Sequence, residues 1–214
     1  MKYGVIVITA GFSGLLSFSF LAVAIGSDYW YIIDVSRANH SDLEELSSHS
    51  GLWRIREGSN ATSWPIHSIF LDTSNNTEIE KHLISSHKVI VTLLPLSLLL
   101  VVLGGICGLV SSLSRNPNLL AGSASYFLFC SLFTLSGVCV YISYCQRAQE
   151  ALEPEILASI HVSYGWSLGL ACVSFGLEVA AGLLLMVAAR IAYLMGHDDH
   201  GVIIAMAGKR MISD

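Results

Sequence analysis

Charged side chains are scarce in this sequence. They make up 13% of the 214 residues, whereas 53% of the residues are hydrophobic, and a soluble domain is normally about 25% charged. The few charges are missing from long stretches, so the apolar residues gather in blocks. This composition excludes a typical soluble domain and indicates a protein that lies in a lipid bilayer.

Four blocks are long enough to cross a membrane, because a spanning helix needs about 20 apolar residues. Three of them carry no charge, and the fourth is interrupted only by Glu178 and Arg190. Lipid offers the backbone no hydrogen-bond partners, and the blocks lack the alternation of barrel strands, so each is predicted to be helical. The predicted spans are residues 5–25, 89–113, 119–144 and 161–194.

The first block has a second interpretation. Lys2, an apolar run and the A-x-A sequence at residues 22–24 are also typical of a secretory signal peptide. However, the apolar run is longer than the roughly 7 to 15 residues of such a signal. We favour a retained first span, since cleavage would leave three spans and move the C-terminus across the membrane.

Basic residues and glycosylation motifs predict the same orientation. Lys and Arg near span ends mark the cytoplasmic side, and on one side of the predicted spans they stand at positions 2, 115, 190, 209 and 210. Residues 26–88 instead hold five basic and nine acidic residues, with N-x-S/T acceptors at Asn39, Asn60 and Asn75. We therefore expect a plasma-membrane protein with cytoplasmic termini and a glycosylated first external loop.

The rest of the predicted organisation follows from this orientation. Residues 1–194 form one four-span domain, residues 145–160 form a second external loop, and residues 195–214 form a flexible cytoplasmic tail. Within the first loop, residues 29–33 and 51–55 are aromatic and β-branched, which is typical of short strands. Tyr29, Trp30 and Tyr31 equally fit an aromatic belt at the membrane surface.

Two further segments of the first loop have simple predictions. Residues 36–50 are polar and are expected to be a mobile excursion. Residues 79–87 fit a short helix that leads into the second span.

Two short motifs of the first external loop, together with their spacing, resemble a known group of proteins. DYW at residues 28–30, followed by GLW at residues 51–53, resembles the W…GLW signature of the claudin, peripheral myelin protein and calcium-channel gamma-subunit superfamily. YGWS at residues 164–167 resembles a gamma-subunit motif, and the longer stretches resemble most closely the branch of transmembrane proteins 114 and 235. The motif residues are Trp30, Gly51, Leu52, Trp53, Tyr164, Gly165 and Trp166.

The resemblance implies a fold and leaves one feature unexplained. It implies an all-α membrane protein: a four-helix transmembrane bundle with a small extracellular antiparallel β-sheet, as in claudins. The family places a cysteine after GLW and two further residues, where this chain has Arg56, and pairs it with another about ten residues later. Losing such a disulfide typically costs about 2–5 kcal/mol. The sheet is therefore held by glycans, span packing and a partner, or it is looser than in relatives.

All five cysteines lie in or beside the predicted spans, at positions 107, 130, 139, 145 and 172. No pair has metal-binding spacing. Cys145 is predicted to be the one thiol near the external face, where an unpaired thiol could link to a partner.

Glu178 is the most unusual single residue, because a carboxylate near the middle of a span costs several kcal/mol unless it is neutralised, paired or hydrated. One interpretation is an ion or proton site, or a contact for a partner's transmembrane segment. The other is an acid hydrogen-bonded to Ser or Tyr side chains inside the bundle. We favour the second, since a single acid makes a poor transport path.

Small residues predict where helices approach one another. Gly104 and Gly108 form a GxxxG pair in the second span, and Gly165 and Gly169 form another in the fourth. Such pairs let helices pack closely in lipid. Packing within the bundle is favoured over dimerisation.

The sequence holds no catalytic motif: there is no nucleophile elbow, phosphate-binding glycine loop or HExxH. We expect no enzymatic activity, cofactor, metal site, nucleic-acid partner or small-molecule substrate. The gamma-type resemblance implies an auxiliary subunit packed laterally on an ion channel or receptor; the alternative is a claudin-like junction or adhesion protein. Membrane lipids are expected partners, together with such a membrane protein or a second copy.

Three features favour the lateral partner over the junction. The three sequons would put glycans on a sheet that must meet another cell closely. The second external loop is acidic and charged. The chain ends in Ser213 and Asp214, without the hydrophobic last residue that junction scaffolds capture by strand addition.

The predicted orientation is tested with peptide-N-glycosidase. We expect treatment to remove glycans from the protein of cell membranes and so to increase its electrophoretic mobility, in up to three steps. Each of the variants Asn39→Gln, Asn60→Gln and Asn75→Gln should lack one of these steps. Unchanged electrophoretic mobility of the untreated and treated protein would contradict the outward placement of residues 26–88.

Overall fold

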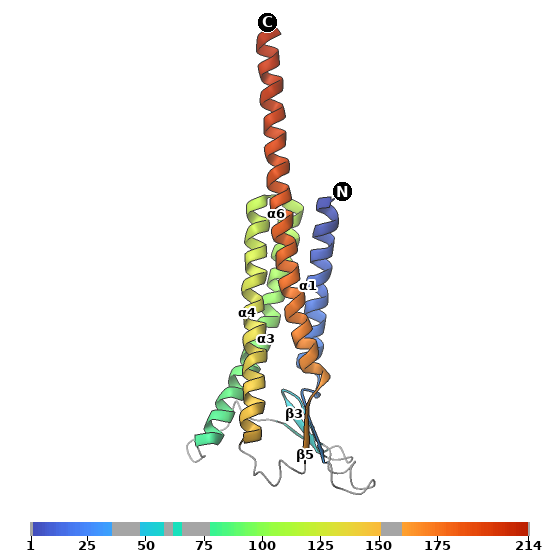
Figure 1. The fold of residues 1–214 in the computed structure, drawn as a ribbon, viewed down its shortest axis with the longest axis vertical. Coiled ribbons are helices and arrows are strands. Elements are labelled where there is room, and N and C mark those ends of the chain that lie inside the picture. Colours follow the sequence, from blue (N-terminus) through green and yellow to red (C-terminus); the bar gives the residue numbers. More distant parts are fainter. Residues whose placement is uncertain (1, 36–47, 58–61, 66–77, 151–159, 214) are drawn as a thin grey trace.

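A bundle of four long helices carries a small sheet at one end (Figure 1). The computed structural model describes residues 2–35, 48–57, 62–65, 78–150 and 160–213. Both chain ends lie at the end of the bundle opposite the sheet (Figure 1). The predicted four-helix bundle with a small antiparallel sheet is confirmed.

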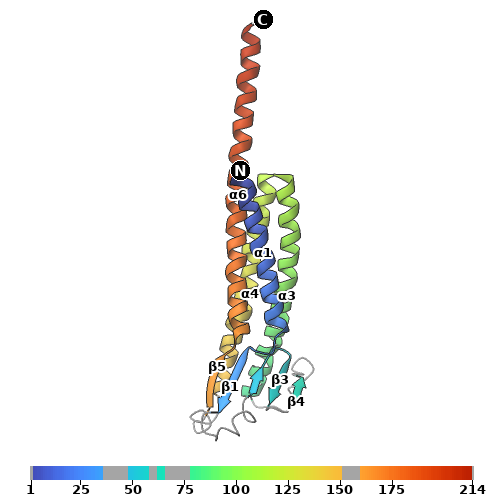
Figure 2. The ribbon, with the colours of Figure 1, turned by 90° about the vertical axis from the view of Figure 1, so that its right-hand side faces the viewer.

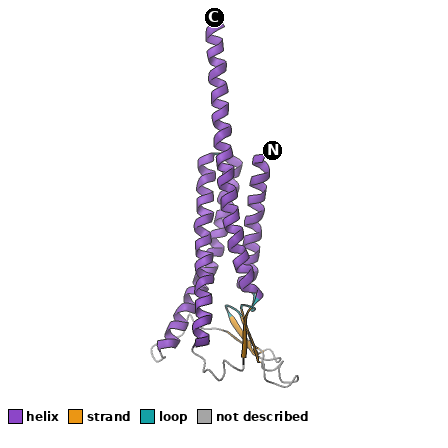
Figure 3. Cartoon of the chain, in the orientation of Figure 1, coloured by secondary structure: helices purple, strands orange, loops and turns teal. Residues whose placement is uncertain are grey.

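The helices are long enough and apolar enough to span a bilayer. They are α1 (Lys2–Gly26), α3 (Glu78–Ser114), α4 (Pro117–Glu150) and α6 (Trp166–Ser213). Their candidate spans are Tyr3–Gly26, Lys81–Ser114, Pro117–Glu150 and Trp166–His197. As Figure 3 illustrates, almost all of the bundle is helical, and strands occur only at its sheet end.

The helices extend beyond the predicted spans. Helix α3 already begins at Glu78, so the short helix predicted over residues 79–87 is continuous with the second span. Helix α4 continues to Glu150, which shortens the predicted second loop. Residues such as Glu, Gln and Arg are good helix formers, so these helices continue where the apolar sequence ends.

The tail predicted to be flexible is also helical. Helix α6 runs without interruption to Ser213 and projects well past the other three helices (Figure 2). The polar residues after Leu194 were expected to end the helix. The segment contains no proline, and its three glycines, Gly196, Gly201 and Gly208, do not interrupt the helix.

The predicted start of the fourth span is wrong. Residues 160–164 form strand β5, and α6 begins only at Trp166. The strand has the sequence IHVSY and carries no acidic or basic group other than His161. A short apolar run of this kind cannot be separated from a helix by hydropathy alone.

The sheet has five antiparallel strands in the order β4-β3-β2-β1-β5 (Figure 2). Strand β5 pairs with β1 from Tyr31↔Tyr164 to Val35↔Ile160, so the second loop closes onto the first. The strands are β1 (Tyr31–Val35), β2 (Ser48–Ser50), β3 (Arg54–Glu57), β4 (Thr62–Pro65) and β5 (Ile160–Tyr164).

The predicted strands overlap β1 and β3, but each observed strand starts two or three residues later. The predicted excursion over residues 36–50 is wrong at its end, because residues 48–50 form β2. The short, polar sequence SHS has no strand signature, and it is a strand because its backbone pairs with both β1 and β3.

The bundle core has two parts. Around the sheet end, Leu21, Trp30, Leu52, Leu94 and Tyr141 are buried together. Around the other end, small side chains such as Ala124, Ala181 and Ala188 surround Phe127 and Leu185. Large apolar side chains cover much of the outside of the helices, as expected where lipid is the solvent.

A tight turn joins α3 to α4. Arg115 has φ of 49°, the left-handed conformation that commonly follows a helix end. The Asn116 side chain accepts a hydrogen bond from the Asn118 amide at 3.0 Å, which caps α4. Pro117 then takes the first helical position, where its missing N–H costs nothing.

Candidate functional site

Glu178 lies in a fully buried cluster of hydroxyl groups in the middle of the bundle. Thr134 on α4 donates to the carboxyl group, with its Oγ1 3.1 Å from Oε1 and 3.0 Å from Oε2. Ser17 on α1 reaches Oε1 at 3.3 Å, and Ser174, one turn before Glu178, reaches it at 3.4 Å. All four side chains are 0% exposed.

The two serines also hold α1 against α6. Ser174 Oγ donates to the Ser17 carbonyl at 2.9 Å, and Ser17 Oγ lies 3.1 Å from the Ser174 carbonyl. Their hydroxyl oxygens are 2.9 Å apart. The cluster therefore joins α1, α4 and α6 by hydrogen bonds at membrane depth.

This arrangement matches the second interpretation of Glu178 given above. Among the residues that the structure describes, the hydrogen bonds to the carboxyl group come from hydroxyls, and no basic side chain takes part. A buried polar network of this kind is stabilising only when its members are satisfied. The geometry supports a structural role in helix association.

The W…GLW motif connects the sheet to the end of α1. The Trp30 indole N–H donates to the Ala24 carbonyl at 2.7 Å, and the Trp53 indole N–H donates to the Ile25 carbonyl at 3.0 Å. These carbonyls belong to the last turn of α1 and lack partners within the helix. Trp30 is 0% exposed, so it is a core residue and not part of an aromatic belt.

Gly51 and Leu52 complete this junction. A Cβ at Gly51 would lie 2.7 Å from the Asp28 Cα and 2.8 Å from the Ser27 carbonyl oxygen, so a side chain cannot fit there. Leu52 is 1% exposed, and its backbone is hydrogen-bonded to the ring of His87 on α3. The motif thus contacts α1 and α3 at once.

Gly165 belongs to the same junction, which corrects the prediction for the second GxxxG pair. It stands between β5 and α6, and a Cβ there would overlap the Tyr29 carbonyl oxygen. Its amide donates to the Trp30 carbonyl at 3.0 Å. Gly169, one turn into α6, has no atom within 4 Å of an added Cβ, so this pair does not pack two helices of the chain together.

The remaining motif residues lie at the edge of the junction. Tyr164 and Trp166 are 47% and 52% exposed. Tyr29 is 41% exposed and its ring stacks on Trp166 at a centroid distance of 5.9 Å. These rings form an aromatic surface beside the first residues of α6, next to the sheet.

The first GxxxG pair does lie at helix contacts. A Cβ at Gly104 would be 3.0 Å from the Tyr126 ring of α4. A Cβ at Gly108 would be 3.5 Å from Phe127 and 3.7 Å from Leu185, which belong to α4 and α6. Close approach of α3 to α4 therefore uses both glycines.

Arg56 makes an ion pair at the position of the family cysteine. Its Nε lies 3.7 Å from an Asp28 carboxylate oxygen, and the two side chains are 43% and 20% exposed. A partly exposed pair of this kind contributes about 0–1 kcal/mol. It replaces only part of what a disulfide supplies, and the tryptophan caps and core packing remain as the main anchors.

The prediction for Cys145 is wrong. Its side chain is 2% exposed and packs in the core near Trp30 and Tyr141, so it cannot link to a partner. The residue sits on the inner face of α4, which continues to Glu150. The three acceptors Asn39, Asn60 and Asn75 lie outside the described residues.

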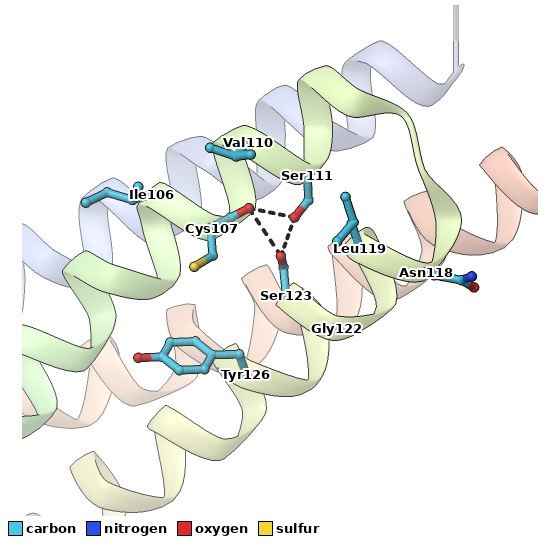
Figure 4. A pocket seen from close by; sticks show the side chains of 9 residues that line it. All are labelled: Ile106, Cys107, Val110, Ser111, Asn118, Leu119, Gly122, Ser123 and Tyr126. Atoms are coloured by element: carbon cyan, nitrogen blue, oxygen red, sulfur yellow. Dashed lines mark hydrogen bonds between the residues drawn. The ribbon is translucent and has the colours of Figure 1, made fainter.

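A shallow groove of about 420 Å³ lies between α3 and α4 at the end away from the sheet (Figure 4). Beside it, Ser111 and Ser123 are 2.6 Å apart at their oxygens, and both donate to the Cys107 carbonyl (Figure 4). Ile106, Val110 and Leu119 line the groove and are about half exposed. Acyl chains of the bilayer fit such an apolar surface.

Comparison with known proteins decides the family of this chain. The family model described as PMP-22/EMP/MP20/Claudin tight junction matches residues 15–187. The chain belongs to this family. Its bundle and sheet are therefore a claudin-like tetraspan fold, and the chain is a non-enzymatic membrane protein like the rest of the family.

Calcium channel gamma subunits are among the proteins similar to this chain. The human voltage-dependent calcium channel gamma-4 subunit is 27% identical over 191 residues, covering 82% of this chain and 58% of that protein. The human and bovine gamma-3 subunits are each 27% identical over 180 residues, covering 78% of this chain and 56% of theirs. The chain thus spans somewhat over half the length of these relatives.

The sequence alone did not identify all the residues of these sites. Ser17, Thr134 and Ser174 carry no motif, although each lies in an apolar block where a hydroxyl needs a partner. That requirement is the one signal that could have paired them with Glu178. His87 was predicted only as the end of a short helix, and its contact with Leu52 had no sequence signal.

The two glycines of the YGWSLG segment give a direct test of the junction. Gly165→Ala should destabilise the protein by about 1–3 kcal/mol, because its methyl group would overlap backbone that cannot easily move. Gly169→Ala, the matched control, should leave stability unchanged or slightly raised. Thermal denaturation of the two purified variants in detergent measures both. Equal stabilities would argue against a tight junction at Gly165.

Substitutions at Glu178 separate a structural role from a charge-dependent one. Glu178→Leu should lower stability by about 1–3 kcal/mol, since the Thr134 and Ser17 hydroxyls lose their buried acceptor. Glu178→Gln keeps the shape and an acceptor oxygen and should cost less than about 1 kcal/mol. The measurement is again thermal denaturation. A Gln variant as unstable as the Leu variant would show that the carboxyl group itself is required.

Proposed function

We propose that this protein is an auxiliary subunit that packs laterally on an ion channel or receptor in the plasma membrane. The observation that carries the proposal is the similarity to calcium channel gamma subunits over 78–82% of the chain. Within the family, the motif stretches support the branch of transmembrane proteins 114 and 235. In this proposal both termini are cytoplasmic, and the sheet and the acceptors Asn39, Asn60 and Asn75 are external.

The outer face of α6 supports a lateral contact. A Cβ at Gly169 or Gly176 would have no atom within 4 Å, so both positions are open on the outside of the bundle. Being seven residues apart, they lie on one face of the helix, with Val173 exposed between them. Open glycines let the backbone of a second membrane helix approach closely.

The neighbouring helix α4 offers a compatible surface. Ser136 and Cys139 are exposed there and small, and Cys139 lies near Cys172 of α6. Together the two helices offer a strip of small side chains at membrane depth. Trp166 is half exposed at the sheet end of this strip and extends the contact toward an external domain.

The sheet supports a second contact point. Arg54 is exposed and Arg56 partly so, on the strand that follows the GLW motif. An external domain of a channel or receptor that offers carboxylates would complement these guanidinium groups. Contacts at both the sheet and α6 would fix the orientation of the partner.

The alternative is a junction or adhesion protein. The specific observation in its favour is that the description of the matching family model names the tight junction. The sequons and the acidic second loop weigh against it. Freeze-fracture of cells that express the protein tests it, because continuous intramembrane strands are expected only of the junctional protein.

The lateral contact is tested by filling the open face of α6. Partners are crosslinked to the protein in native membrane and identified by mass spectrometry. Gly169→Ile combined with Gly176→Ile should reduce the recovery of channel or receptor subunits at least fivefold. The bundle should fold normally, because a Cβ added at either glycine has no atom of the described chain within 4 Å.

A matched control exists on another helix. Gly4 and Gly11 of α1 are also seven residues apart and equally open, so Gly4→Ile with Gly11→Ile should leave recovery unchanged. If only the α1 variant failed to recover channel or receptor subunits, the contact would lie on α1 and not on α6. Recovery of only junction scaffolds and further copies of the chain by the unmodified protein would overturn the auxiliary role.

A further inference from the structure

A cavity of about 270 Å³ lies between the sheet and the end of α4. From the sheet it is lined by Tyr31 and Ile33 of β1 and by Ser48 and Ser50 of β2. From α4 it is lined by residues that include Tyr144 and Ala148. Its function is not accounted for by the junction, the Glu178 cluster or the proposed partner contacts.

Strand geometry explains why these side chains meet. Successive residues of a strand point to opposite faces, and Tyr31 pairs with Ser50 while Ile33 pairs with Ser48. One face of β1 and β2 therefore faces α4. His49 points to the other face, where its ring stacks on Tyr29 at a centroid distance of 4.5 Å.

The lining selects for a neutral ligand that carries a hydrogen-bonding group. None of the residues that line the cavity is charged at neutral pH. Burial raises the pKa of Tyr31, so its phenol stays neutral, and its oxygen accepts a hydrogen bond from the Gln149 amide at 3.2 Å. Within the described part of the chain, no hydrogen bond uses the hydroxyls of Tyr144 or Ser48, so both are free to bind a ligand.

The remaining lining is largely apolar. Ile33, Ile55 and Ala148 contribute aliphatic surface, and the rings of Tyr141 and Tyr144 contribute aromatic surface. A cavity slightly smaller than the roughly 300 Å³ of the smallest drug-sized sites takes a compact ligand or one end of a longer one. A rigid fused-ring molecule with a single hydroxyl fits this description.

The position of the cavity indicates where such a ligand comes from. It lies at the sheet end of helix α4, and a span of this length and composition would bring that end to the surface of a bilayer. A phospholipid would bring a charged head group, for which the lining has no counter-charge. We propose that the cavity binds the hydroxyl end of a membrane sterol, held by Tyr144 and Ser48.

The groove of Figure 4 is larger but lacks this selectivity. Its lining is largely apolar, and the two serines beside it bond each other and the Cys107 carbonyl. It offers acyl chains a surface, and within the described residues the hydroxyls of Ser111, Ser123 and Tyr126 already have protein partners. The sterol site is therefore assigned to the cavity beneath the sheet.

Photolabelling of the full chain in nanodiscs tests the site. The probe is a photoreactive cholesterol analogue with a free hydroxyl, and labelled peptides are identified by mass spectrometry. Labelling should concentrate on β1, β2 and residues 141–148, and excess cholesterol should reduce it at least fivefold. The matching sterol ketone, which cannot donate a hydrogen bond, should compete more weakly.

Paired variants connect the labelling to the cavity. Ala148→Phe fills it and should reduce labelling about tenfold, while Gln146→Phe, which places the same ring on the exposed side of α4, should not. Tyr144→Phe should reduce labelling about fivefold, and Tyr126→Phe, which alters a tyrosine of the Figure 4 groove, should leave it unchanged. Should Ala148→Phe prevent folding, the tyrosine pair decides.

Two results would overturn the proposal. One is labelling spread along the lipid-facing residues of all four helices and insensitive to Ala148→Phe and Tyr144→Phe, which means annular lipid only. The other is equal competition by cholesterol, its ketone and diacylglycerol, which means that the cavity does not select a sterol hydroxyl.

Discussion

The end of α1 is the point on which the rest of this structure depends. A helix that leaves a bilayer exposes carbonyl groups that have no partner within the helix, and here two indole N–H groups, from Trp30 and Trp53, bond the last of them. Because both tryptophans belong to the first loop, this loop must return to α1 after each excursion. The strands consequently form directly against the end of the bundle, and Leu52 is buried between the sheet and the helices.

The same requirement for internal partners acts at membrane depth. Lipid cannot satisfy the carboxyl group of Glu178, so hydroxyls from three helices surround it. Where α3 and α4 meet at the other end, Ser111 and Ser123 meet the same requirement by bonding each other and a backbone carbonyl. Polar contacts thus fix the relative height of the helices, while small residues such as Gly104 and Gly182 set how closely they approach.

The number of spans and two short strands could be predicted from local pattern, and the resemblance to the claudin superfamily implied that strands form a sheet. Contacts between distant segments could not. Nothing local pairs Ser17 with a carboxylate 161 residues away, and nothing in SHS or IHVSY reveals a strand, since both are strands through their neighbours. Gly165 was misread for the same reason: GxxxG spacing indicates helix packing, but this glycine stands before the helix, against the backbone of Tyr29.

Strand β5 passes into α6 through Gly165 alone, without an intervening loop. The strand is paired along its whole length with β1, and β1 is anchored to α1 through Trp30. The direction in which α6 enters the bundle and the orientation of the sheet are therefore set together at Gly165, whose amide donates to the Trp30 carbonyl. The surface that the sheet presents to water thus has its orientation fixed by two transmembrane helices at once.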